Sequence, residues 1–159
     1  MKKALVTGGA GFIGSHLSSR LLREGWDVHI IDNLSTGFRE NIPEGAIFHE
    51  LDFSDPNFSN RLPSERFDVV FHLAAQSSGE ISFDDPAYDL MTNCLSTVLL
   101  CDWCLKHGTP RFIFTSSMSI YGDQDAQPVS ETATPSPKSF YGIGKLASEA
   151  YLKVYEDMG

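Results

Sequence analysis

Short apolar runs alternate with helix-like stretches along this chain, and turn-forming residues separate them. The runs have the length and the flanking residues that are typical of buried strands. They are Ala4–Val6, Asp27–Ile31, Ala46–Leu51, Phe67–Ala75 and Arg111–Thr115. The predicted helices run from Phe12 to a stop at Gly25, from Pro86 to His107, and through Tyr141 and Lys145. This alternation predicts an α/β fold with a doubly wound parallel sheet, built from right-handed βαβ units.

A glycine-rich turn joins the first strand to the first helix. Gly9 suits a sharp turn, Gly11 lets the backbone approach a phosphate without a Cβ in the way, and Gly14 lets helix and strand pack closely. The helix N-terminus offers unpaired N–H groups and the positive end of its dipole to an anion. The order of strand, glycines and helix therefore predicts a Rossmann-type pyrophosphate site. The residues expected to contact a dinucleotide cofactor at this site are Gly8, Gly11, Phe12, Ile13 and Gly14.

An acidic residue ends the second strand, about 20 residues after the glycines. Asp32 is placed there to accept hydrogen bonds from an adenosine ribose. The alternative is a glycine-rich turn with an incidental Asp. A carboxylate repels a 2′-phosphate and no Arg directly follows Asp32, so the pattern favours NAD over NADP. Arg39 is close enough in sequence to weaken that preference.

The composition fits one compact NAD-binding domain that spans residues 1–159, because 42% of the residues are hydrophobic. A net charge of −9 argues against nucleic acid or an anionic membrane surface as a partner, since both need clustered Lys and Arg. No apolar stretch approaches the length of a membrane span, and the first residues run straight into a strand. We therefore expect a cytoplasmic protein.

Three cysteines fall in the second predicted helix, and Cys101 and Cys104 form a C-x-x-C pattern. The redox form of this motif lies at a helix N-terminus, whereas this one lies deep in a helix. A zinc site would need a second pair of ligands, which His107 alone does not supply. We interpret the cysteines as buried helix residues, and we expect no metal site.

Ligands of parallel sheets bind beyond the carboxyl ends of the strands. The residues expected to line that edge are Gly8–Gly14, Asp32, Asp52, Ala74–Gln76, Ser116 and Ser117. Asp52 could instead be an ordinary turn or N-cap residue. His72 lies among apolar neighbours, so we interpret it as a packed histidine rather than a base. Asn33–Gly45 and Asp123–Ser139 are polar and are expected to be loops.

Tyr141 and Lys145 are four residues apart, so they share one face of the last helix. A cation there stabilises a phenolate and lowers the pKa of the tyrosine, which makes the phenol a usable base near neutral pH. The alternative is a Tyr and a Lys on a solvated helix surface. A dinucleotide site and a serine hydroxyl at the end of the fifth strand favour the functional interpretation.

Several segments together resemble a known family, the extended short-chain dehydrogenase/reductases, and in particular nucleotide-sugar epimerases of the UDP-glucose 4-epimerase type. The segments are Thr7–Gly14, Asp32–Leu34, His72–Ala75, Ser116–Ser117, Ile120–Gly122 and Tyr141–Lys145. The resemblance covers the whole chain. It implies an NAD cofactor, a nucleotide-sugar substrate such as a UDP-hexose, and a homodimer formed through the helices Pro86–His107 and Lys138–Asp157.

The same resemblance implies a role for each matching residue. Tyr141 would be the base, Lys145 would hold the nicotinamide ribose and tune Tyr141, and Ser117 would hydrogen-bond the reacting sugar hydroxyl. The other residues expected to contact or support the cofactor are Asp32, Asn33, Asp52, Phe53, Leu73, Ala74, Ala75 and Asn93. For Asn93, the alternative is a helix residue that hydrogen-bonds locally.

The resemblance also separates subclasses. Dehydratases of the family carry Asp-Glu after the catalytic hydroxyl residue, where this chain has Met118 and Ser119, so an epimerase is preferred. Family members continue beyond the position of Gly159 into a substrate-binding region, so we expect this chain to be an N-terminal part that is inactive alone. The alternatives are a sugar-nucleotide reductase or dehydratase, or a non-catalytic NAD-binding module.

Overall fold

The computed structural model describes residues 1–125 and 128–158, and the chain forms two compact units. The first unit comprises Met1–Ala75 and Leu99–Thr115. The second begins with Gln76–Val98 and continues from Ser116. The predicted loop Asp123–Ser139 belongs to the second unit, and its residues 126 and 127 lie outside the described part of the chain.

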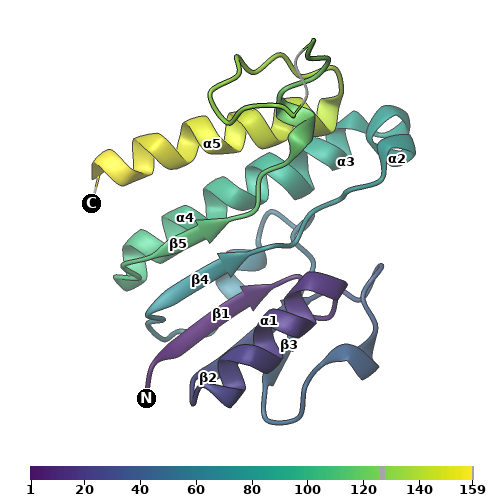
Figure 1. Ribbon diagram of the computed structural model, residues 1–159. Coiled ribbons are helices and arrows are strands. Elements are labelled where there is room, and N and C mark those ends of the chain that lie inside the picture. Colours follow the sequence, from purple (N-terminus) through teal and green to yellow (C-terminus); the bar gives the residue numbers. More distant parts are fainter. Residues whose placement is uncertain (126–127, 159) are drawn as a thin grey trace. The chain divides into compact units, whose positions relative to one another are not determined.

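The first unit contains a parallel sheet of five strands in the order β3-β2-β1-β4-β5 (Figure 1). The strands are β1 (Lys3–Thr7), β2 (Asp27–Asp32), β3 (Ile47–Glu50), β4 (Val69–His72) and β5 (Phe112–Phe114). All four neighbouring pairs are parallel, which confirms the predicted fold class. β4 is shorter than the predicted strand, because the N–H groups of Leu73 and Ala74 donate to the side chain of Thr7 (both 3.1 Å).

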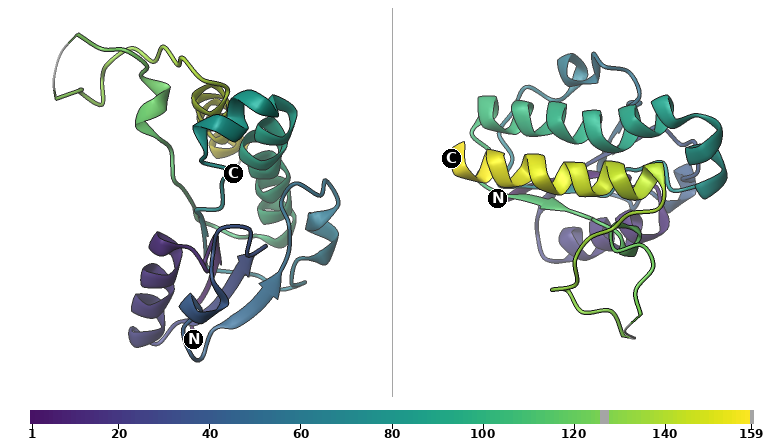
Figure 2. Two further views of the ribbon diagram at one scale, coloured as in Figure 1. Left: turned by 90° about the vertical axis from the view of Figure 1, so that its right-hand side faces the viewer. Right: turned by 90° about the horizontal axis from the view of Figure 1, so that it is seen from above.

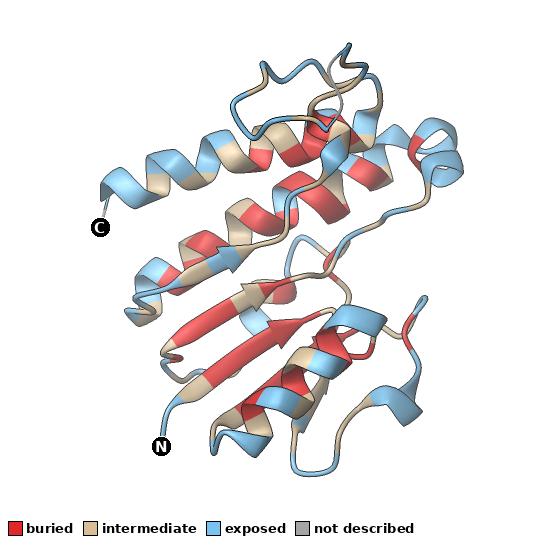
Figure 3. Cartoon of the chain, viewed as in Figure 1, coloured by how far each residue is buried: buried red, intermediate tan, exposed pale blue. Residues whose placement is uncertain are grey.

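Each face of the sheet is covered by one helix of this unit. One face carries Val6, Val28 and Ile30, which pack with Leu21 of α1 (Phe12–Arg23). The other carries Leu5, Ile31 and Val70, which pack with residues from the later part of α4 (Ser96–His107). Figure 3 shows the residues of the central strands β1 and β4 mostly as buried, and the residues of β2 are buried after its first. A strand covered on both faces must be apolar throughout, as these runs are.

The helix α1 has a narrower apolar face than its sequence predicts. Leu21 is buried, whereas Phe12 and Ile13 are 80% and 65% exposed. Both lie in the first turn of the helix. Gly25, with φ of +80°, follows the end of α1 as predicted.

The second unit is mostly helical. It contains α2 (Gly79–Asp84), α3 (Pro86–Leu90), η3 (Met91–Leu95), η4 (Met118–Ile120) and α5 (Phe140–Met158). α5 lies beside α3 and η3 (Figures 1 and 2). The sequence did not predict α2, which is short and starts at a glycine after its N-cap Ser78. In the described part of the chain, no helix combines the length and apolarity needed to cross a bilayer.

The helical segment predicted as continuous from Pro86 to His107 contains a π-helical turn, η3. A π turn contains one extra residue and frees backbone groups from the α-helical hydrogen-bond pattern. Here the carbonyl of Asn93 accepts hydrogen bonds from the hydroxyls of Thr97 (2.9 Å) and Ser148 (3.1 Å). Ser148 belongs to α5, so the π turn anchors the two helical segments of this unit to each other.

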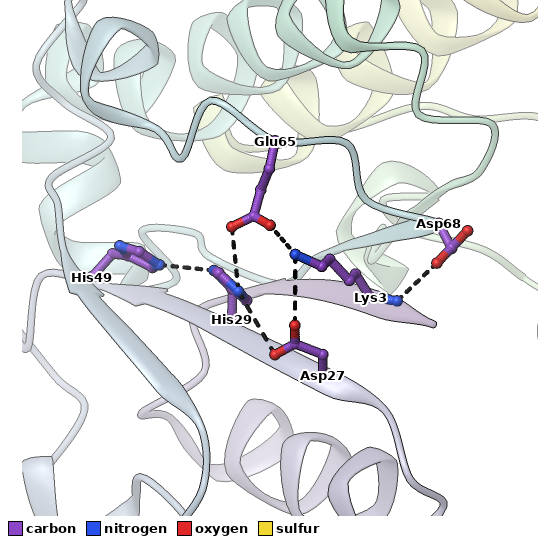
Figure 4. Close-up of polar contacts among 6 residues, drawn as sticks. All are labelled: Lys3, Asp27, His29, His49, Glu65 and Asp68. Atoms are coloured by element: carbon purple, nitrogen blue, oxygen red, sulfur yellow. Dashed lines mark hydrogen bonds and ion pairs between the residues drawn. The ribbon is translucent and has the colours of Figure 1, made fainter. Parts of the chain in front are cut away.

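A polar cluster in the first unit surrounds a buried histidine of β2 (Figure 4). His29 is 3% exposed, its Nδ1 lies 3.0 Å from Nε2 of His49, and its Nε2 lies 3.5 Å from Glu65. The ammonium of Lys3 pairs with both Glu65 and Asp27. Carboxylates beside Nε2 favour a proton on that nitrogen, so Nδ1 of His29 accepts the N–H of His49. Among the described residues, no group of His, Cys, Asp or Glu is arranged to hold a metal ion.

Both histidines of this cluster resist protonation. Burial lowers the pKa of His29 below its ordinary value of 6.5, although Glu65 and Asp27 oppose the shift. The pKa of His49 is also lowered, by burial and by the neighbouring His29. The folded chain therefore binds fewer protons than the unfolded chain just below pH 6.5. The stability that the two neutral histidines contribute is therefore present above pH 6.5 and is lost as the pH falls.

We predict that the double variant His29→Gln/His49→Gln loses less stability than the wild type when the pH falls from about 7 to about 5. Urea unfolding at several pH values, monitored by circular dichroism, gives the slope of the free energy of unfolding against pH. His16→Gln is the matched control, because His16 is exposed on α1, and it should keep the wild-type slope. Equal slopes for the wild type and the double variant would contradict the prediction.

Candidate functional site

The glycine turn after β1 lies against the ends of β2 and β4. Gly8 adopts φ of +68°, and its N–H donates to the carbonyl of Ile31 (2.8 Å). A Cβ at Gly8 would lie 2.8 Å from the amide nitrogen of Ala74, and one at Gly14 would lie 2.7 Å from Cα of Gly9. The left-handed residue of the turn is thus Gly8, whereas Gly9 is restricted by the side chain of Ile30. The close packing expected at Gly14 is present.

The N-terminus of α1 has the features that an anion requires. Gly11 is its N-cap and provides no side-chain hydrogen bond, and the first turn contains no acidic residue. The first-turn N–H groups and the helix dipole therefore face the end of the turn without a competing carboxylate. A pyrophosphate fits this arrangement, since the backbone can approach it closely where Gly8, Gly11 and Gly14 lack side chains.

Asp32 lies beside this turn at the end of β2 and is only 8% exposed. Its Oδ2 accepts the N–H of Ala10 (3.0 Å) and its Oδ1 accepts the N–H of Leu34 (2.8 Å). These two bonds fix the carboxylate and leave lone pairs on both oxygens for a ribose hydroxyl. Leu34 adopts φ of +57°, an uncommon conformation for a residue with a side chain. Asn33 caps the next turn by accepting the N–H of Ser35 (3.0 Å).

The residues after β3 have two different environments. Asp52 accepts the N–H of Ser54 (2.8 Å), as expected of a turn residue. Burial tends to raise the pKa of Asp52, but hydrogen bonds from Ser54 and Asn33 lower it overall, so Asp52 is held as a carboxylate beside Asn33. Phe53 is buried in the core with its ring 4.5 Å from that of Phe58. Only the backbone of Phe53 is therefore suited to contact a ligand.

The segment after β4 is held by one threonine. The hydroxyl of Thr7 accepts the N–H groups of Leu73 and Ala74 and lies 2.7 Å from Nδ1 of His72. Ala75 follows directly and ends this part of the first unit. His72 is 1% exposed, which agrees with its interpretation as a packed histidine. Leu73, Ala74 and Ala75 thus follow the strand at the edge where the sequence placed them.

The second unit brings Ser117 and Tyr141 together. Ser117 is the N-cap of η4, where its Oγ accepts the N–H of Ser119 (3.1 Å), and its hydroxyl lies near the Tyr141 phenol, whose pKa it tends to lower. The pKa of Tyr141 is raised, because burial outweighs the hydrogen bond from Ser117 and the carboxylate of Asp89 adds to the rise. The expected lowering by the neighbouring cation is therefore wrong for the protein without a cofactor, since desolvation dominates.

Lys145 is buried one helical turn after Tyr141. It is 1% exposed, and its Nζ lies 5.8 Å from the centroid of the Tyr141 ring. Burial lowers the pKa of Lys145 to about 8, and the carboxylate of Asp89 opposes that shift. Tyr141 and Lys145 are thus not a pair on a solvated helix surface, because Lys145 is buried. A buried ammonium requires compensating charge.

Asp89 supplies compensating charge from α3. It is 1% exposed, and its Oδ2 accepts a hydrogen bond from Nε2 of Gln76 (3.1 Å). Its Oδ1 has no hydrogen-bond partner among the described residues. A Cβ at Gly144 would lie 3.7 Å from this oxygen, so the backbone just before Lys145 runs close to the carboxylate.

Asn93 holds the segment that enters the second unit. Its Oδ1 accepts the N–H of Gln76 (3.0 Å) and its Nδ2 donates to the Gln76 carbonyl (2.9 Å). These partners are 17 residues away, so the local helix hydrogen bond considered as the alternative is not the role of this side chain. Asn93 therefore fixes the backbone of Gln76.

The three cysteines are free thiols in the buried part of the helical segment. Burial raises the pKa of both Cys101 and Cys104 to about 12. A thiol with such a pKa is protonated at neutral pH and is therefore a poor nucleophile. The C-x-x-C pattern is therefore part of the core, as the sequence indicated.

The family model described as the NAD-dependent epimerase/dehydratase family matches residues 4–159. The chain belongs to this family. UDP-glucose 4-epimerase from Mycolicibacterium smegmatis is 40% identical over 162 residues, a match that covers 98% of this chain and 52% of that protein. The chain spans about half the length of the relatives that it matches.

Solved structures of epimerases superpose closely on this member of the epimerase/dehydratase family. The UDP-glucose 4-epimerase of Thermotoga maritima with UDP-glucose has a TM-score of 0.90 at 41% identity and covers 98% of this chain and 51% of its own. That of Thermus thermophilus in complex with NAD has a TM-score of 0.88 at 40% identity, with the same coverage. NAD is the cofactor of this family, which confirms the predicted cofactor.

Sequence reasoning missed the roles of three residues, although it had placed Gln76 at the carboxyl edge of the sheet. Thr7 fixes the end of β4, Gln76 is bound by Asn93, and Asp89 faces Lys145. Asp89 and Asn93 are four residues apart, but Asn93 belongs to the π turn, so regular helical spacing gives no signal for the role of Asp89. No local pattern indicates the role of Thr7, because its partners are more than 60 residues away.

We predict that Asp89→Asn lowers the pKa of Lys145 below its value of about 8, because the variant removes the charge that stabilises the ammonium. Asn keeps an oxygen acceptor for Gln76, so the fold should be retained, which circular dichroism verifies. The pKa is measured by NMR titration of the ¹³C-dimethylated lysines, with Lys145→Arg assigning the signal. Asp84→Asn, which removes an exposed carboxylate from α2, should leave the Lys145 pKa unchanged. An unchanged pKa in Asp89→Asn would contradict the prediction.

Proposed function

We propose that this chain is the N-terminal, NAD-binding part of a nucleotide-sugar epimerase of the UDP-glucose/UDP-galactose 4-epimerase type. The observation that carries the proposal is that Tyr141 lies near the hydroxyl of Ser117 and one helical turn before the buried Lys145, whose Nζ is 5.8 Å from the Tyr141 ring. This cluster occurs in one chain with a glycine turn and Asp32 suited to a dinucleotide. The relatives and solved structures described above support the same activity, and a homodimer remains part of the proposal.

In this proposal the first unit holds the adenosine and pyrophosphate parts of NAD. The N–H groups at the start of α1, those of Phe12 and Ile13 among them, bind the pyrophosphate. Asp32 accepts from the adenosine ribose, and Asn33 and Asp52 contact the adenosine. The backbone of Phe53 and the small residues after β4, Leu73 to Ala75, pass beside the cofactor.

Tyr141 is the proposed base. Its phenolate oxygen takes the proton from a sugar hydroxyl, and Ser117 hydrogen-bonds the same hydroxyl and orients it. NAD, when bound here, would supply reversible hydride transfer at the sugar carbon. A positive charge near a phenol favours the phenolate, so the protonated Lys145 and the oxidised cofactor together oppose the rise in pKa that burial causes. Lys145 also binds the nicotinamide ribose.

The residues after Ser117 favour an epimerase over a dehydratase. Elimination of water needs an acid near the leaving hydroxyl, and the positions after Ser117 are occupied by Met118 and Ser119. The hydroxyl of Ser119 lies 3.2 Å from that of Ser117 and supplies no carboxyl group. We therefore propose that the reaction is the transfer of a proton and a hydride, with a UDP-hexose as the substrate.

We predict that Tyr141→Phe, made in the full-length gene product, lowers the interconversion of UDP-glucose and UDP-galactose by about 10²–10⁴-fold because the base is removed. NAD should stay bound, as measured by its absorbance after protein denaturation. Tyr151→Phe is the matched control, since Tyr151 lies on the same helix α5 and is 51% exposed, and it should turn over normally. Normal turnover by Tyr141→Phe would show that another group is the base.

We also predict that the purified 159-residue chain binds NAD weakly and does not epimerise UDP-galactose. The relatives that it matches are about twice as long, and we assign nucleotide-sugar binding to the remaining half. Binding is measured by NMR titration with NAD, and turnover by a coupled assay for UDP-glucose. Measurable turnover by this chain would overturn the prediction.

A further inference from the structure

Arg39 is the first cation after Asp32 in the sequence, and a 2′-phosphate on the adenosine ribose would need such a partner. The segment that carries Arg39 is fixed beside the glycine turn. The carbonyl of Ala10 accepts hydrogen bonds from the N–H of Phe38 (3.2 Å) and from Nδ2 of Asn41 (2.9 Å). The N–H of Ala10 in turn donates to Asp32 (3.0 Å). Arg39 and the ribose-binding carboxylate are therefore tied to the same residue.

The close approach of this segment is built into the sequence at Gly37. A Cβ at Gly37 would lie 2.9 Å from the carbonyl carbon of Ala10, so a larger residue would push the segment away from the turn. Two hydrogen bonds and one close backbone contact thus fix the loop that follows β2. The position of the Arg39 backbone is set by the fold rather than by its own side chain.

The guanidinium of Arg39 is held by β3. Its Nη2 lies 2.6 Å from Oε2 of Glu50, and its Cζ lies 5.0 Å from the centroid of the Phe48 ring. Glu50 is the strand neighbour of Asp32, and Phe48 is the neighbour of Ile30. Side chains two residues apart in a strand share a face, so Asp32, Glu50 and the Arg39 guanidinium lie on the same side of the sheet.

We propose that Glu50 is a specificity-determining residue, which holds the Arg39 guanidinium in an ion pair so that it does not serve a 2′-phosphate. This role rests on the proposed binding of NAD at the Asp32 edge. Asp32 disfavours a 2′-phosphate by its own charge, and Glu50 adds to that preference by occupying the nearby cation. An Arg between a carboxylate and an aromatic face has both its charge and its planar surface engaged.

The test measures the affinities of NAD and NADP for the 159-residue chain by NMR titration, which is suited to weak binding. Glu50→Gln should bind NADP about three- to fivefold more tightly than the wild type at about 50 mM salt, as expected for one exposed charge pair. Its affinity for NAD should stay within about twofold, because NAD carries no 2′-phosphate for the released Arg39. The double variant Glu50→Gln/Arg39→Gln should lose this increase in affinity for NADP.

Glu40→Gln is the matched control, because it removes the same charge from η1 (Arg39–Asn41), next to Arg39, while the pair with Glu50 stays intact. It should leave both affinities unchanged. A gain that persists in the double variant, an equal gain in Glu40→Gln, or no gain in Glu50→Gln would each overturn the role of Glu50. If the wild type binds neither cofactor, the proposed NAD site in this chain fails, and the role of Glu50 fails with it.

Discussion

The first unit depends on how closely the turn after β1 approaches the strands on either side of it. Gly8 lies against the start of the segment after β4 and donates to the end of β2, and no side chain fits at that point. Because the turn is so close, the N–H of Ala10 reaches Asp32 and the start of α1 is directed beyond the sheet edge. One steric constraint therefore positions the helix dipole, the carboxylate of Asp32 and the residues after β4.

A different constraint organises the second unit, where charged groups are buried in a small helical structure. Lys145 and Asp89 are each 1% exposed, and the carboxylate of Asp89 favours the charged form of Lys145 against the effect of burial. Gln76 and Asn93 connect this carboxylate to the chain that arrives from β4. The polar groups support one another as a network next to the half-buried Tyr141. Burial raises the pKa of this phenol.

The sequence predicted most of the fold, because strands and glycine turns are specified by neighbouring residues. Apolar runs and the turn-forming residues between them predicted the five strands, the parallel sheet and the helix end at Gly25. The pKa of Tyr141 was predicted in the wrong direction, because helical spacing indicates a nearby cation but not the loss of water. Thr7, Asp89 and Glu50 were missed for a related reason. Their roles come from contacts between distant segments, which a single sequence does not reveal.

The π turn at Met91–Leu95 has a geometric consequence. The extra residue that it accommodates rotates everything before it by roughly 100° about the helix axis, compared with an uninterrupted α-helix. Asp89 lies before the turn and Ser96 lies after it, so the inserted residue decides in which direction the carboxylate points. A one-residue deletion in this turn would restore a regular helix and turn Asp89 away from α5. The π turn thus determines the direction in which the side chains of α3 point, relative to the side chains of α4.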